Sequence, residues 1–157
     1  MAEALGPAEH AAQIAAARDR LLTFAAACTD EIWHATPLAV HGDHRTIGII
    51  VDHVAHGYEY MGGWMREILA GRTPEVDGAL VDRLNAAHAA SAGHLTQAGA
   101  MEHLTRSGDE LIGLVAGLGE ADLNAGAGRV RRFAEIAARH SDTHRTDIED
   151  ALRARTR

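Results

Sequence analysis

The chain has 157 residues, a length that suits one domain with a single core, and we treat residues 1–157 as one domain. Its formal net charge is −7 with neutral histidines, which argues against nucleic-acid binding, because nucleic-acid binders usually carry a basic face. Aromatic residues make up only 4%, and no run of about 18 apolar residues occurs, so we expect packed helices without a membrane span.

The spacing of apolar residues predicts an all-α protein, a four-helix bundle with one short extra helix. The predicted helices cover residues 8–33, 47–70, 78–90, 100–117 and 129–153. The stretch 34–45 holds a proline, a glycine and three histidines and is typical of a loop. Thr46 is a suitable N-cap for the second helix, and Gly71 followed by Pro74 ends it. Loops of moderate length favour an antiparallel bundle.

The N-terminal residues and the single cysteine bear on the location of the protein. Residues 1–10 have neither the basic start nor the continuous apolar run of a signal peptide, so we expect a cytoplasmic protein. Cys28 is the only cysteine, which excludes an internal disulfide. It lies on the inward face of the first predicted helix and is expected to be an inert buried thiol.

Eleven histidines stand out in this sequence, because histidine binds metals and transfers protons near neutral pH. His140 and His144 lie near the middle of the apolar face of the last helix. Residues four apart are neighbours on a helix, and two such imidazoles can reach one ion with Zn–N bonds of about 2.0–2.1 Å. Two interpretations stay open for the pair. They bind a metal ion, or they are core residues with hydrogen-bond partners, since an unpartnered buried imidazole costs on the order of 1–3 kcal/mol.

The second helix offers a third ligand. His53 lies at the edge of the apolar face, in line with Tyr60 and Trp64, which line a pocket or simply pack in the core. Asp52 marks the polar side of this helix, and His56 lies further toward that side. We interpret His56 as a solvated surface residue rather than as a group that supports a metal ligand. Three histidines on two helices leave open coordination positions, which is typical of catalytic rather than structural metal sites.

We interpret most of the remaining polar candidates as solvated surface residues rather than as parts of a functional site. This interpretation applies to the three histidines of the loop, which are His34, His41 and His44. The alternative is that they line the site or bind a second metal. Asp147 is interpreted as a solvated acid rather than a partner that orients a ligand imidazole. Arg139 falls on the polar face, whereas Arg145 adjoins a ligand and stays undecided as a group that binds a substrate carboxylate. No serine or cysteine nucleophile with a base partner is evident, so the catalytic residues are unknown.

Four segments carry a further signal: TIGIIVDHVAH at 46–56, LAGRTP at 69–74, DRLN at 82–85 and HSDTH at 140–144. In these segments the sequence resembles the DinB-like metalloprotein superfamily, in particular its branch of mycothiol-dependent maleylpyruvate isomerases and thiol S-transferases. The resemblance implies a four-helix bundle whose divalent metal, typically zinc or nickel and sometimes iron, is held by one histidine of the second helix and two ligands of the last. Those ligands are His53, His140 and His144.

The resemblance also implies an activity. The metal favours the thiolate of a low-molecular-weight thiol such as mycothiol, and the thiolate attacks an electrophilic carbon of the substrate. Candidates for binding the thiol cofactor are Tyr60, Trp64 and Arg145. A homodimer is one option that the resemblance leaves open. The alternatives are a metal-dependent hydrolase, a non-catalytic metal-binding stress protein, and a bundle whose histidines only form hydrogen bonds.

Overall fold

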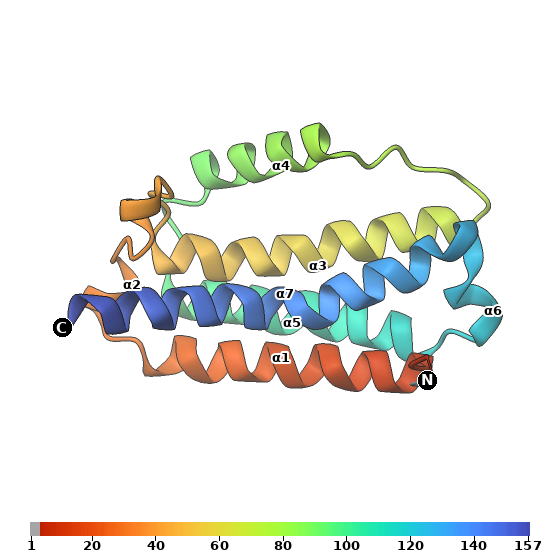
Figure 1. Cartoon of the computed structure of the whole chain (residues 1–157), viewed down its shortest axis with the longest axis horizontal. Helices are drawn as coiled ribbons and strands as arrows, with labels where there is room; N and C mark the ends of the chain where they lie inside the picture. The colour runs from red at the N-terminus through yellow and green to blue at the C-terminus, as the bar shows by residue number, and fades with distance from the viewer. Residues whose placement is uncertain (1–3) are drawn as a thin grey trace.

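The computed structural model describes residues 4–157, which form helices and connecting loops without strands (Figure 1). The first three residues of the segment in which we expected no signal peptide lie outside this range. The helices are α1 (Pro7–Ala27), α2 (Asp30–Trp33), η1 (Ala39–His41), α3 (Ile47–Leu69), α4 (Gly78–Ser91), α5 (Gln97–Ala116), α6 (Glu120–Leu123) and α7 (Ala125–Arg155).

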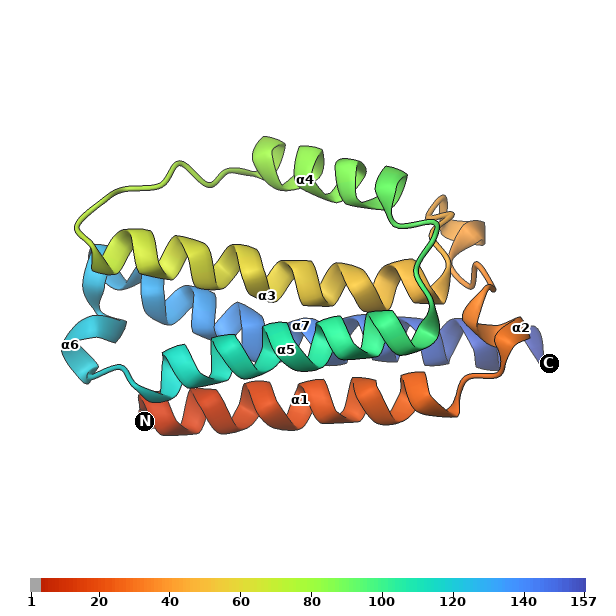
Figure 2. The same cartoon turned by 180° about the vertical axis from the view of Figure 1, so that it is seen from behind.

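The bundle consists of α1, α3, α5 and α7, with α1 and α3 each packed against both α5 and α7. The extra helix α4 runs back along the outside of α3 (Figure 2). It returns the chain to the end where α3 starts, so α3 and α5 run in the same direction. Asp52 near the start of α3 contacts His103 near the start of α5, and further along Gly62 lies beside Leu111. The expectation of an antiparallel bundle is therefore wrong for this pair, and likewise for α1 and α7, because Leu5 contacts Arg131 and, further along, Arg20 contacts Asp142.

The core of the bundle is largely aliphatic. Each fully buried aliphatic side chain contributes about 1.5–3 kcal/mol relative to exposure. The fully buried side chains include Ile14, Leu21, Ile50, Met65, Leu104, Leu111 and Ile148. The one buried tyrosine, Tyr58, directs its hydroxyl to Ser141 of α7 within hydrogen-bonding distance. None of the helices within residues 4–157 is long and apolar enough to cross a membrane.

The end of the first helix differs from the prediction, and the start of the last helix is irregular. The first helix stops at Ala27, because Cys28 is extended and Thr29 starts the short α2 by accepting a hydrogen bond from the backbone N–H of Ile32. Cys28 is half-buried, and burial raises the pKa of its thiol. The start of α7 contains a left-handed stretch at residues 126–128, so the regular helix begins near the predicted position 129.

Candidate metal centre

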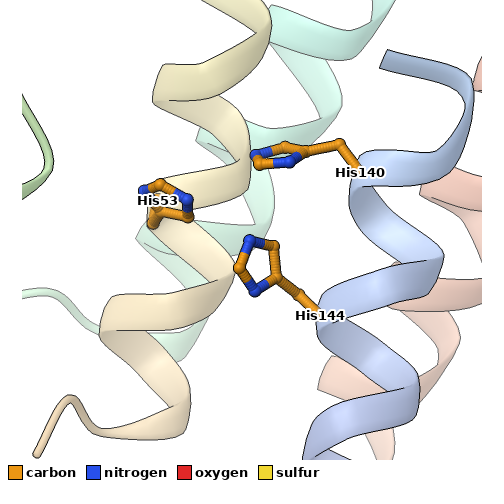
Figure 3. Close-up of side chains that lie close together, drawn as sticks. All are labelled: His53, His140 and His144. Atoms are coloured by element: carbon orange, nitrogen blue, oxygen red, sulfur yellow. The ribbon is translucent and has the colours of Figure 1, made fainter. Parts of the chain in front are cut away.

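Three histidines converge between α3 and α7 (Figure 3). His53 points from α3, and His140 and His144 point from successive turns of α7. One nitrogen of each lies within 4.8 Å of the others. The ring centroids are 5.2 Å apart for His53 and His140, 5.0 Å for His53 and His144, and 4.8 Å for His140 and His144. The structure thus brings together the three histidines that the sequence selected, although His53 precedes His140 by 87 residues and His144 by 91.

The surroundings keep these imidazoles neutral. Burial and then the neighbouring imidazoles lower the pKa of His53 to about 2, and the same causes lower that of His140 to about 3. Burial, with the charge of Arg45, also lowers the pKa of His144. Neutral imidazole is the form that binds metals. The side chains are therefore in the protonation state that a metal site needs.

One buried nitrogen of the three histidines, Nε2 of His140, has no hydrogen-bond partner among residues 4–157. Leaving such an atom unsatisfied costs on the order of 1–3 kcal/mol. A divalent ion at this nitrogen would supply the missing interaction, so the residues present fit a metal centre.

A glycine makes room for this ring. Gly57 lies one turn after His53 on α3, and a Cβ atom placed on it would lie 2.7 Å from Nε2 of His140. Real Cβ contacts are longer than this, so any larger residue would displace the imidazole. Gly57 is thus part of the geometry of the site, although it carries no donor atom.

An apolar cleft of about 440 Å³ opens beside the three histidines. Tyr60 and Trp64 of α3 lie at its wall, with ring centroids 5.9 Å apart and planes at 20°. Trp64 also contacts Phe133 of α7, at a centroid distance of 5.4 Å. Residues from α4 and the segment before it complete the lining: Val76, Val81, Leu84 and Asn85. Such an apolar cleft with a few polar groups at one end is typical of a small-molecule site.

The arginine at this cleft is Arg45 rather than Arg145. The guanidinium of Arg145 pairs with Asp142 and Glu149 and faces the α1 side, so the structure does not bring it to the histidines. Arg45 lines the cleft, and Asp43 holds it through contacts of 2.9 Å (Nε to Oδ1) and 2.7 Å (Nη2 to Oδ2). Sequence reasoning missed Arg45, which ends the predicted loop 34–45 and directly precedes the cap of the helix that carries His53.

The other polar candidates lie at the surface. The exposed side chains include His34, His41, His44, Arg139 and Asp147. This exposure agrees with their interpretation as solvated surface residues.

A second polar cluster lies on another face of α3. Asp52 was assigned to the polar side of the helix, but the residue is only 2% exposed. Its carboxylate accepts hydrogen bonds from Nε2 of His88 at 2.7 Å and from Nδ1 of His103 at 2.6 Å. Although burial acts to raise it, these hydrogen bonds hold the pKa of Asp52 below its usual value. The available signal was the recurrence of Asp52, His56 and Glu59 at the spacing of one helix face.

A comparison with known protein families identifies one family that matches this chain. A family model described as the DinB superfamily matches residues 13–148. This range includes the three converging histidines, the cleft residues and nearly all of the four bundle helices. No curated protein and no solved structure matches the chain.

Proposed function

We propose that this chain, which belongs to the DinB superfamily, is a metal-dependent thiol S-transferase or isomerase. The observation that carries the proposal is the convergence of His53, His140 and His144, within 4.8 Å of one another, beside an apolar cleft. The chain supplies three neutral nitrogen donors, which suit zinc or nickel first and iron next. Three protein donors leave coordination open, as catalytic centres require.

The thiol is the first reactant in this proposal. A bound divalent ion supplies positive charge that favours the thiolate form of a thiol. We propose mycothiol as the first thiol to test, because the segment 82–85 resembles the mycothiol-linked branch of the family. Leu84 and Asn85 of this segment line the cleft. The proposal places the activity in the cytoplasm, where small thiols are kept reduced.

The electrophile is the second reactant, and the cleft indicates its chemistry. Trp64 and Tyr60 offer stacked rings, and aliphatic side chains face them. A planar, largely apolar electrophile therefore fits better than a sugar or a polyanion. Arg45 stands at the histidine end, where its charge suits a carboxylate of the substrate. We propose small unsaturated carboxylic acids as the first substrates to assay.

The test measures turnover of metal-loaded, tag-free protein with a panel of such electrophiles, with mycothiol, with cysteine and without thiol. The proposal predicts turnover that requires both thiol and metal and is lost in His53→Ala, His140→Ala and His144→Ala. Turnover without thiol would instead favour a hydrolase. Metal binding without any turnover would favour a non-catalytic protein. If all three variants keep full metal content, the ligands are wrongly assigned. Light scattering of the same sample tests for a homodimer.

A further inference from the structure

The second polar cluster collects metal-ligating side chains from three helices. α3 contributes Asp52, His56 and Glu59, on a face turned away from His53. α4 contributes His88, and α5 contributes His103. Asp52 and His88 are almost completely buried, with side chains 3% and 4% exposed. The cluster is therefore built into the packing of the helices and is not a group of surface charges.

The hydrogen bonds of His103 place a positive charge in this cluster. Nδ1 of His103 lies 2.6 Å from Oδ1 of Asp52, and Nε2 lies 2.7 Å from Oε1 of Glu59. Both nitrogens therefore face carboxylate oxygens, and both must carry a proton to donate. Without a metal, two carboxylates thus share a single imidazolium, which leaves the group with one uncompensated negative charge. A divalent ion in place of that proton would balance both carboxylates.

His56 faces two carboxylates and forms a hydrogen bond with neither of them. Its Nε2 lies 3.6 Å from Oδ2 of Asp52, and its Nδ1 lies 3.4 Å from Oε2 of Glu59. Both distances exceed those of ordinary hydrogen bonds. Two ligands of one tetrahedral ion, with bonds of about 2.0–2.1 Å, lie roughly 3.3–3.4 Å apart. One donor atom each of Asp52, His56 and His103 already lies within 4.8 Å of the others.

A buried nitrogen beside this group also has no partner. Nδ1 of His88 forms no hydrogen bond within residues 4–157, while its Nε2 contacts Asp52. The ring centroid of His88 lies 4.6 Å from that of His56 and 6.1 Å from that of His53. His88 thus neighbours one ring of each cluster.

We propose that Asp52, His56 and His103 form a second divalent-cation site, with Glu59 beside it, distinct from the three-histidine centre. A set of one carboxylate and two imidazoles suits zinc, iron or manganese, and zinc is the ion to test first. The two sites share no ligand, although Asp52 and His53 are consecutive on α3. The proposal goes beyond the proposed function, because it requires no thiol chemistry.

The test counts ions with variants that separate the sites. Tag-free protein is stripped with a chelator, titrated with Zn²⁺ by calorimetry, desalted and analysed for metal by mass spectrometry. We expect about two ions per chain in the wild type and about one in His56→Ala. The double variant His140→Ala with His144→Ala should also hold about one. His94→Ala, an exposed histidine outside both clusters, should hold the wild-type number.

His56→Ala is the informative variant because His56 contributes no hydrogen bond to the network, so the contacts of Asp52 stay intact. A thermal melt of the metal-free variant, expected within a few degrees of wild type, verifies the fold. If the wild type binds one ion and His56→Ala keeps it, the second site does not exist. The same holds if His56→Ala binds two. If the wild type binds one ion that His56→Ala loses, the second site stands and the three-histidine centre fails.

Discussion

Gly57→Ala offers a sharp test of the three-histidine centre, because it adds one methyl group and removes no donor. The new Cβ would lie 2.7 Å from Nε2 of His140, and the ring has to retreat by about 0.7 Å to reach an ordinary contact of 3.4 Å. Metal–ligand distances tolerate only about 0.2 Å. His140 therefore leaves its ligand position, while the backbone of α3 stays in place.

The magnitude follows from ligand linkage. We take a loss of affinity on the order of 100-fold, the upper end for disturbing the residues that orient a ligand. At a metal concentration of 100 times the wild-type Kd, binding stabilises the wild type by about 2.7 kcal/mol and the variant by only about 0.4 kcal/mol. The difference corresponds to about 5–9 °C in the metal-induced shift of Tm. Without metal, alanine in a helix interior adds up to about 0.5–1 kcal/mol, less the cost of tilting the ring.

The assay compares Tm with and without Zn²⁺ and measures Kd by calorimetry. The matched control is Gly63→Ala, since Gly63 lies on the same helix and nothing lies within 4 Å of its added Cβ. It should show the helix effect with wild-type metal affinity. If Gly57→Ala binds Zn²⁺ as tightly as Gly63→Ala, Nε2 of His140 is not a ligand, and the reasoning from its buried, unpartnered state is refuted.

Three further predictions concern stability and the cleft. The pKa values of about 2 for His53 and about 3 for His140 lie below the unfolded value of 6.5, so the unfolded chain takes up protons first. The free energy of unfolding of the metal-free protein therefore falls as pH drops from about 6.5 toward 3, by up to about 1.4 kcal/mol per pH unit for each residue. Urea titrations at several pH values measure this dependence on pH, which should be weaker in His140→Ala than in the wild type. His10 is 2% exposed, and neither ring nitrogen has a hydrogen-bond partner within residues 4–157, so His10→Leu should raise the free energy of unfolding by about 1–3 kcal/mol. Trp64→Ala should leave metal content unchanged and raise KM for a planar electrophile about 2–10-fold, the value of one aromatic contact.

The helical spacing of the sequence was enough to select the three converging histidines. His140 and His144 are four residues apart on one apolar face, and His53 lies on the inward side of its own helix. Because a helix has a regular period, such a selection needs no knowledge of the tertiary structure. The metal-binding role of these residues stays a prediction until ions are counted.

The second cluster could not be found in the same way. Asp52 appears polar and solvated when α3 is considered alone. It is buried because His88 and His103 arrive from α4 and α5, at sequence separations of 36 and 51 residues. Which face of α3 meets α5 depends on the direction in which α4 returns the chain, and no local pattern encodes that. The break at Cys28 was missed for a different reason, because the apolar spacing continues through Cys28 to Ile32 and conceals the N-cap at Thr29.

The candidate metal ligands of the three-histidine centre and part of the cleft lining lie on different helices. The candidate ligands lie on α3 and α7, inside the bundle, where substitutions disturb the core. Val81, Leu84 and Asn85 of the cleft lie on α4, which packs on the outside of α3 (Figure 2). Changes at these three positions, or in the length of the segment that precedes α4, can therefore alter which small molecule fits the cleft while leaving the three histidines and His88 intact. In the proposed function, substrate selectivity and metal binding thus depend on different segments, and Val81, Leu84 and Asn85 are the positions to randomise in a library that seeks new substrates.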